Sequence, residues 1–478
     1  MNKDFAELAL GCFFEISKIP RGSGNERAAS DFLVEFAERH GCEAVQDEYF
    51  NVLVRKPGSV GRENEPAVIL QNHIDMVCEK NAGTEHDFLK DPIIPIIDGD
   101  WVFARGTTLG ADNGAGMAAA MAVIASTDIS HPPIEAVFTT DEEVGMIGAA
   151  NFDAALLKGN RLINLDSGAD AAVTVGCAAS ADVDITIPIK KQSFPANHTA
   201  LELTVKGLVG GHSGVDIHKG FANANVLMAR LLKDLFDYNG IFLSTINGGA
   251  QRNAIPRECF AIIACKEDHL DTVIQAAESL ETTFRAEFPK EPDLTIIVNP
   301  SETGSHVMTA ETFGKILNFI TTAPNGVLAM SAHIDGLVQT STNQGVVITG
   351  ENDVKILIFP RSSSSTEQAE TISKYLTLAE SLDIKARALN EKPPWEYREE
   401  SPLRDIAADI LCEIYGSKPE IMAIHAGLEC GIFLEKIPGA DAIALGPLIL
   451  GAHSPDEKMS LVSFNNICEF LVRILGKI

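Results

Sequence analysis

The sequence AVILQNHID, residues 67–75, joins a short apolar run to polar residues that can bind a metal ion. The run Ala67–Leu70 is typical of a strand that is buried on both faces of a parallel sheet. His73 and Asp75 follow this run, and in an extended chain their spacing directs both side chains to the same side. Asp75 can therefore orient the imidazole of His73 as its hydrogen-bond partner.

Three further apolar runs also lead to potential metal ligands. Ile134–Phe138 is followed by Glu142 and Glu143, Leu162–Leu165 by Asp166, and Ala442–Leu445 by the loop that contains His453. Asp112 lies in a glycine-rich loop that opens a helix, where the helix dipole favours an anion. Because ligands bind beyond the carboxyl ends of the strands in open α/β sheets, we expect these side chains to converge.

The chemistry of these residues favours a pair of zinc ions. The expected ligands are His73, Asp112, Glu143, Asp166 and His453. Two imidazoles and three carboxylates, without a thiolate, suit a hydrolytic zinc pair better than a structural zinc. The carboxylates compensate only part of the charge of two zinc ions, and the remainder would lower the pKa of a shared water towards neutrality.

The hydrophobic pattern changes near residue 187 and changes back near residue 390. Outside these positions, buried apolar runs alternate with helical patterns, as in a mostly parallel sheet flanked by helices. Between them, Leu201, Leu203 and Val205 alternate with polar residues, which is typical of a strand with one solvated face. We predict an α/β protein in which residues 1–186 and 391–478 form one domain and residues 187–390 form an inserted α/β sandwich.

Composition excludes several classes of partner. The chain of 478 residues has 38 Lys and Arg against 66 Asp and Glu, and its formal charge of −28 disfavours nucleic acid and anionic membrane surfaces. It has no apolar run of about 18 residues that could span a bilayer. Lys3, Asp4 and Glu7 are incompatible with the apolar core of a signal peptide. Nine cysteines without a repeating spacing indicate reduced thiols, so we expect a cytoplasmic protein.

Two other local patterns compete with this interpretation or add to it. Gly114–Ala119 formally fits the dinucleotide pattern G-x-G-x-x-A, but a polar, glycine-rich segment stands where a strand should precede it. Ser23 and Glu26 have the spacing of a capping box before a helix. No G-x-S-x-G nucleophile elbow is present.

Six motifs, in order along the chain, carry a resemblance to a known family. They are HIDMV at 73–77, ARGTTLGADNG at 104–114, GGHSG at 210–214, RNAIP at 252–256, HAGLECG at 425–431 and HSPDE at 453–457. With these motifs the chain resembles the di-zinc aminoacylase/carboxypeptidase G clan of metallopeptidases and, more narrowly, the bacterial aminoacyl-histidine dipeptidases. The resemblance implies a split catalytic domain with an inserted lid domain, a homodimer formed through the lid, and two Zn²⁺ per subunit with Co²⁺ or Mn²⁺ as substitutes.

The resemblance also implies a role for each residue of the metal centre. His73 and Asp166 would hold one zinc, Glu143 and His453 the other, and Asp112 would bridge the two, while Glu142 would act as general base and Asp75 would tune His73. The peptide bond between Asp112 and Asn113 is expected to be cis, as is common in this clan.

Further residues are implied to bind the substrate. His212 would stabilise the oxyanion, acting within its own subunit or across the dimer. Asn253 and Arg361 would bind the main chain and the terminal carboxylate, with a surface strand position as the alternative for Arg361. His425 and Glu429 either face the substrate or only pack their loop.

We therefore predict hydrolysis of unblocked dipeptides, with Xaa-His peptides as reference substrates, by a zinc-activated water with Glu142 as base. One alternative is an aminoacylase or carboxypeptidase that cleaves N-acyl amino acids. Another is a non-catalytic peptide or metal binder on the same scaffold. Glu142 argues against a binder, since a binder needs the ligands but not the base.

Overall fold

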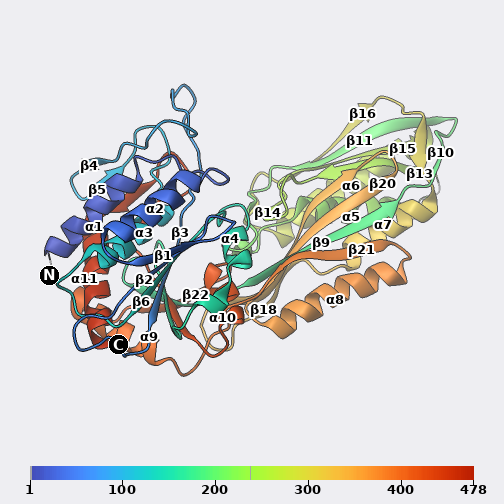
Figure 1. The fold of residues 1–478 in the computed structure, drawn as a ribbon. Helices are drawn as coiled ribbons and strands as arrows, with labels where there is room; N and C mark the ends of the chain where they lie inside the picture. Colours follow the sequence, from blue (N-terminus) through green and yellow to red (C-terminus); the bar gives the residue numbers. More distant parts are fainter. Residues whose placement is uncertain (1–2, 237, 239) are drawn as a thin grey trace. The chain divides into compact units, whose positions relative to one another are not determined.

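The computed structural model describes residues 3–236, 238 and 240–478, and the chain divides into two compact units (Figure 1). Unit 1 comprises Met1–Gly176, Tyr397–Ala423 and Leu428–Ile478, and unit 2 comprises Cys177–Glu396 and Ile424–Gly427. Among the described residues, no helix has the length and apolar character needed to cross a membrane. Each unit has its own sheet, so each is described separately.

Unit 1 is built on an eight-stranded sheet with the order β1-β2-β6-β3-β7-β23-β8-β22. The strands are β1 (Glu43–Gln46), β2 (Val52–Lys56), β3 (Val68–His73), β6 (Ile134–Thr139), β7 (Arg161–Asn164), β8 (Ala172–Cys177), β22 (Glu420–Ile424) and β23 (Asp441–Ala444). The central strands β6, β3, β7 and β23 run parallel, and every residue of β3 and β6 is buried. These four strands contain the predicted apolar runs, because strands covered on both faces need no polar alternation.

Helices accompany this sheet, together with a small second sheet. The helices are α1 (Lys3–Ile16), α2 (Arg27–Arg39), α3 (Ala111–Ala125), α4 (Ile147–Asn151), α9 (Pro402–Tyr415), α10 (Glu429–Lys436) and α11 (Leu461–Lys477). The small sheet has the order β24-β25-β5-β4, with β4 (Ile96–Asp98), β5 (Trp101–Phe103), β24 (Ile449–Leu450) and β25 (Lys458–Ser460). Nearly all of α3 is buried, because its alanines and glycines allow close packing. The glycines of Gly114–Ala119 serve this packing and do not follow a strand.

Unit 2 contains a nine-stranded sheet with the order β16-β11-β15-β13-β19-β20-β9-β21, and β18 also pairs with β19. The strands are β9 (Ala179–Pro188), β11 (His198–Lys206), β13 (Ile241–Gly248), β15 (Cys259–Lys266), β16 (Thr295–Ser301), β18 (Gly326–Met330), β19 (Val338–Thr349), β20 (Asp353–Ser362) and β21 (Lys385–Lys392). All of these pairings are antiparallel, an arrangement in which strands commonly have one solvated face. The α/β fold class is therefore confirmed.

The described residues of unit 2 also form α-helices and short strand pairs. The helices are α5 (Ala224–Phe236), α6 (Leu270–Glu287), α7 (Ala310–Thr322) and α8 (Ser365–Ser381); the pairs are β10 (Lys191–Ser193) with β17 (His306–Met308), and β12 (Gly211–His212) with β14 (Ala254–Ile255). The helices pack on the large sheet over an apolar core that includes Leu203, Ile263, Phe284 and Tyr375.

The observed division of the chain differs from the predicted boundaries at 187 and 390. Unit 2 begins earlier and ends later, and it also includes Ile424–Gly427. The reason is that β9 starts at Ala179 and already pairs with β20 and β21 there. Its first residues are buried small and apolar side chains, so they look like the buried runs of unit 1 and give no local sign of the change.

We expect Gly116→Ala to destabilise unit 1 by about 1–3 kcal/mol, the usual cost of overpacking. A Cβ at Gly116 would lie 2.4 Å from the Leu165 carbonyl oxygen and 2.7 Å from Asn72 Oδ1. The matched control is Gly11→Ala in α1, where no described atom apart from the neighbouring backbone of the helix lies within 4 Å of the added Cβ. The control should be neutral or stabilising by up to about 1 kcal/mol, since alanine favours the helix. Equal melting temperatures for the two variants would contradict this account of α3 packing.

Candidate metal centre

Six of the predicted site residues lie together at the carboxyl ends of the parallel strands in unit 1. His73 is the last residue of β3, Glu142 and Glu143 follow β6, Asp166 follows β7, Asp112 is near the start of α3, and His453 lies between β24 and β25. Because β6, β3 and β7 are parallel neighbours, their ends lie side by side. The peptide bond between Asp112 and Asn113 is cis, as expected.

Asp112 faces both histidines, with one carboxylate oxygen for each. Its Oδ1 lies 3.2 Å from His73 Nε2, and its Oδ2 lies 3.2 Å from His453 Nε2. Asp166 Oδ1 completes the first group at 3.6 Å from His73 Nε2, and Glu143 Oε1 completes the second at 3.1 Å from His453 Nε2. The ligand atoms of each group lie within 4.8 Å of one another, which fits two adjacent cation positions sharing Asp112.

The surroundings of His73 support a cation in this place. Its Nδ1 lies 3.1 Å from the Asp75 carbonyl oxygen and 3.3 Å from Asp75 Oδ1, while its Nε2 faces Asp112 and Asp166. Both ring nitrogens therefore face oxygens, and a neutral imidazole has only one N–H to offer. A divalent cation bound at Nε2 removes this conflict and leaves the proton on Nδ1, held by Asp75.

The pKa shifts in the centre indicate an excess of buried negative charge. Burial acts to lower the pKa of His73, but Asp166, Asp112 and Asp75 outweigh it and raise that pKa well above its usual range. Hydrogen bonds to Asp112 and Glu143 raise the pKa of His453 to about 10. Burial raises the pKa of Asp166 to about 6. The histidines thus attract positive charge, and divalent cations would supply it to all ligands at once.

Glu142 and Glu143 differ in their surroundings although they are adjacent. Potential ligand atoms of Glu142 and Glu143 both lie close to His73. Glu143 also lies close to Asp112 and His453, whereas Glu142 does not belong to that second cluster of potential ligands. Burial raises the pKa of Glu142 well above its ordinary value, His73 opposes this shift, and Asp166 adds to it. Glu142 is therefore a carboxyl group beside the cation positions with a strong affinity for a proton.

Asp75 does more than hold His73. It is fully buried, its Oδ1 accepts from Glu142 N at 3.0 Å, and its Oδ2 accepts from Glu143 N at 3.2 Å. Ser23 Oγ also donates to Asp75 Oδ2, at 2.7 Å. One carboxylate thus joins the end of β3 to the loop that follows β6.

The predicted capping box at Ser23 and Glu26 is wrong. Glu26 precedes α2 but makes no side-chain cap, and its carboxylate instead accepts from Asp141 N at 3.0 Å. Ser23 is committed to Asp75. Ser23 and Glu26 therefore hold the loops of the site, a role that sequence reasoning missed. Their spacing before a helix is the same as that of a capping box, so it indicated a helix cap instead.

Glu429 lies beneath the strand ends, fully buried at the start of α10. It accepts hydrogen bonds from Thr139 Oγ1, at 2.7 Å, and from Gln71 Nε2. Gln71 Oε1 in turn accepts from Asn164 Nδ2 at 2.6 Å, and Asn164 Oδ1 accepts from Asp166 N at 3.1 Å. Burial raises the pKa of Glu429 to about 8. This network links β3, β6 and β7 below the ligands.

Other predicted substrate residues lie in unit 2, around a buried arginine. Arg361, in β20, is only 6% exposed, so the surface position considered from the sequence is wrong. Its guanidinium lies over the ring of Phe359 at 4.6 Å, and its Nε has no hydrogen-bond partner among the described residues. Burial lowers its pKa to about 10, which leaves it charged at neutral pH. A buried guanidinium with a free N–H is suited to binding an anion.

Two histidines accompany Arg361. His212 Nδ1 accepts from Gly214 N at 3.2 Å and from Val215 N at 3.0 Å, so the ring proton is on Nε2. His425 Nε2 lies 2.7 Å from Ser341 Oγ. Burial, aided by the nearby charge of Arg361, lowers the pKa of His425 to about 3. Burial and the charge of Arg361 also lower the pKa of His212, so both rings are neutral hydrogen-bonding groups at neutral pH.

Asn253 lies in the loop between β13 and β14, directly before the first residue of β14. Its carbonyl oxygen accepts from Ser213 N at 2.8 Å, next to the pairing of His212 with Ala254. Its side chain is exposed, which leaves the amide free to meet a ligand.

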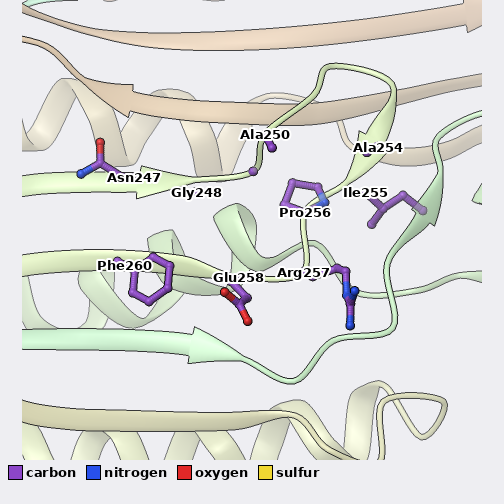
Figure 2. Close-up of a pocket in the computed structure, with 10 residues that line it drawn as sticks. Asn247, Gly248, Ala250, Ala254, Ile255, Pro256, Arg257, Glu258 and Phe260 are labelled. Atoms are coloured by element: carbon purple, nitrogen blue, oxygen red, sulfur yellow. The ribbon is translucent and has the colours of Figure 1, made fainter. Parts of the chain in front are cut away.

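A cavity of about 600 Å³ in unit 2 contains none of the predicted site residues (Figure 2). Its walls are residues 247–250 and 254–258 together with Phe260, from β13, β14 and β15. Among the described residues, no group of potential metal ligands lines this cavity.

The sequence of this chain matches a family of peptidases. The family model described as "Peptidase family M20/M25/M40" matches residues 69–247 and 252–477, and a "Peptidase dimerisation domain" model matches residues 203–292. The cytosol non-specific dipeptidase of Escherichia coli K12 is 37% identical over 467 residues, covering 98% of this chain and 96% of the relative.

Solved structures include two informative matches. The aminoacylhistidine dipeptidase of Vibrio alginolyticus is 39% identical, with a TM-score of 0.89 over 98% of this chain and 96% of the other. The aminopeptidase PepT of Bacillus cereus is 15% identical, with a TM-score of 0.58 over 99% of this chain and 98% of the other, and shows likeness of fold alone.

We expect His425→Gln to reduce the acid sensitivity of the protein. The pKa of His425 is about 3 in the folded chain and about 6.5 in an unfolded chain, so the unfolded state gains a proton first as pH falls. Between pH 7 and pH 5 this costs the folded state about 2 kcal/mol, a cost that glutamine removes. Urea denaturation of both proteins at the two pH values measures the difference. An equal loss of stability in both would contradict the assignment.

Proposed function

This chain belongs to the peptidase family M20/M25/M40, and we propose that it hydrolyses unblocked dipeptides at a dinuclear zinc centre, with Xaa-His peptides as reference substrates. The observation that carries the proposal is Asp112, which offers one carboxylate oxygen to each histidine of the centre. The dipeptidases from Escherichia coli and Vibrio alginolyticus that match nearly the whole chain support the choice of substrate.

The donor set fits two zinc ions. His73 and Asp166 would hold one, Glu143 and His453 the other, and Asp112 would bridge them. When bound, the pair would polarise the scissile carbonyl and lower the pKa of a water. Asp75 keeps the Nδ1 proton on His73 and so directs the lone pair of Nε2 to the metal.

Glu142 is the general base in this proposal. Glu143 is already directed to His453, whereas Glu142 lies beside the centre with a raised pKa caused by burial. Its carboxylate takes a proton from the attacking water and passes it to the leaving amine. Asp75 orients Glu142 by accepting a hydrogen bond from its backbone N–H.

Residues of unit 2 would recognise the substrate. We assign its terminal carboxylate to Arg361, whose Nε is buried and has no hydrogen-bond partner in the described part of the chain. The Nε2–H of His212 would stabilise the oxyanion, within its own subunit or across a dimer, and Asn253 would bind the main chain. His425, which is hydrogen-bonded to Ser341, would contact the substrate beside Arg361 as a neutral donor or acceptor.

The same comparisons support a proposal for the assembly and the location of the protein. The match of residues 203–292 to a peptidase dimerisation domain supports a homodimer formed through unit 2. The cytosolic relative and the acidic charge of the chain support a cytoplasmic enzyme that acts on small peptides.

Substituting Glu142 and Glu143 in turn separates the base from the ligand. Glu142→Gln should retain two zinc ions and lose about 10²–10⁴-fold in turnover, because it removes only the proton acceptor. Glu143→Gln should lose metal, because a neutral amide replaces an anionic ligand. Elemental analysis beside the dipeptide rate measures both effects. Full activity of Glu142→Gln, or loss of zinc from it alone, would reverse the two roles.

A substrate panel tests the proposed specificity. We expect Xaa-His and other free dipeptides to be cleaved, longer peptides to be poor substrates, and chelation of the metal to abolish activity until zinc is restored. N-acetyl amino acids serve as the comparison. If they were cleaved faster than every dipeptide, the aminoacylase alternative would replace the dipeptidase proposal. Zinc binding without hydrolysis of either class would support a binder.

A further inference from the structure

A buried carboxylate, Glu457, holds the loop that carries Asp112. Glu457 is 2% exposed, and its two oxygens accept four consecutive backbone N–H groups. Oε2 accepts from Leu109 N at 2.8 Å and Gly110 N at 2.9 Å, and Oε1 accepts from Ala111 N at 2.8 Å and Asp112 N at 3.2 Å. Each carboxylate oxygen accepts two of these hydrogen bonds, so the acceptor capacity of Glu457 is used by the backbone of this loop.

Arg21 holds the same loop through its carbonyl. Its Nη2 donates to the Gly110 oxygen, while Nη1 donates to the oxygens of Ile74, at 2.7 Å, and Asp75, at 3.1 Å. Arg21 is itself 2% exposed. The guanidinium therefore connects the Asp112 loop to the residues that follow His73.

The glycines of this loop are required by that contact. Gly110 has φ +69°, and a Cβ there would lie 2.7 Å from both Arg21 Nη2 and Met76 Sδ. At Gly114 a Cβ would lie 2.6 Å from Arg21 Nη2. The segment LGADNG thus has glycine where the arginine approaches its backbone.

Glu457 also belongs to the turn that carries His453. Ser454 N donates to the Gly451 oxygen at 3.2 Å, and Glu457 N donates to the Ser454 oxygen at 3.0 Å, so the turn is closed by its own hydrogen bonds. A shift of the Glu457 carboxylate relative to the Asp112 loop would therefore change the distance between His453 and Asp112. That distance is 3.2 Å between His453 Nε2 and Asp112 Oδ2.

We propose that Glu457 is a positioning residue that sets the His453–Asp112 separation, and with it the affinity of the metal position formed by His453, Glu143 and Asp112. Arg21 supports it by fixing the same loop to the end of β3. The inference rests on the proposed dinuclear centre. Glu457 touches neither the substrate nor the metal; it acts through the backbone of residues 109–112.

Glu457→Gln and Glu457→Asp test this role. Glutamine replaces one oxygen by an NH₂ group, which would face two backbone N–H donors, whereas aspartate keeps both oxygens on a shorter chain. The matched control is Glu135→Gln, because Glu135 is also 2% exposed in unit 1 and accepts from Lys158 N and Gly159 N, away from the ligands.

Zinc is titrated into metal-free protein against a chromophoric chelator, and kcat, KM and the melting temperature are measured for each variant. Glu457→Gln should weaken one of the two zinc sites by about 10–100-fold, the usual effect of losing a group that orients a ligand. The other zinc site should change little, and kcat should fall more than KM rises. Glu457→Asp should lie between wild type and Glu457→Gln, and Glu135→Gln should bind both zinc ions as wild type does.

Unchanged zinc affinities in Glu457→Gln, or an equal weakening in Glu135→Gln, would overturn the positioning role. If Glu457→Gln does not fold, Glu457→Asp decides, and wild-type affinity at both sites in that variant overturns the proposal. A wild-type protein that binds no pair of zinc ions would instead remove the proposed dinuclear centre, so the two failures are distinguishable.

Discussion

The shared carboxylate of Asp112 is the contact on which the organisation of unit 1 depends. One oxygen faces His73 and the other faces His453, although these histidines come from opposite ends of the chain. Such a bridge tolerates little movement, because a change of either partner breaks one half of it. The parallel strands supply the first partner, and the small sheet with its β24–β25 turn supplies the second. Two separate segments of unit 1, Met1–Gly176 and Leu428–Ile478, therefore meet at one carboxylate.

Buried carboxylates hold the loops around this bridge in place by accepting hydrogen bonds from backbone N–H groups. Asp75 holds residues 142 and 143, Glu26 holds residue 141, and Glu457 holds residues 109–112. A carboxylate satisfied by N–H groups keeps its charge at lower cost than an unpaired one. The centre nevertheless gathers more negative charge than its histidines offset, and for this reason divalent cations suit it.

Unit 2 shows the opposite arrangement. Its buried Arg361 keeps a positive charge, and the two histidines beside it are neutral at neutral pH because burial and that charge lower their pKa values. A fixed cation with neutral hydrogen-bonding neighbours is suited to an anionic group such as a peptide carboxylate. In the proposed function, unit 1 would therefore bind the cations and unit 2 would recognise the anionic end of the substrate.

Signals that lie within a few residues were enough to predict the parallel strands of unit 1, the side chains that gather at their ends and the half-solvated strands of unit 2. Burial on both faces produces an apolar run that needs no knowledge of its neighbours, and a ligand at the end of such a strand stands beside it in the sequence. The roles of Ser23, Glu26 and Glu457 could not be predicted in this way. Ser23 and Asp75 are 52 positions apart, and Glu457 and Asp112 are 345 apart. Tertiary structure alone decided these contacts, and likewise the start of unit 2 at Cys177, because a hydrogen bond between distant segments leaves no periodic trace in either of them.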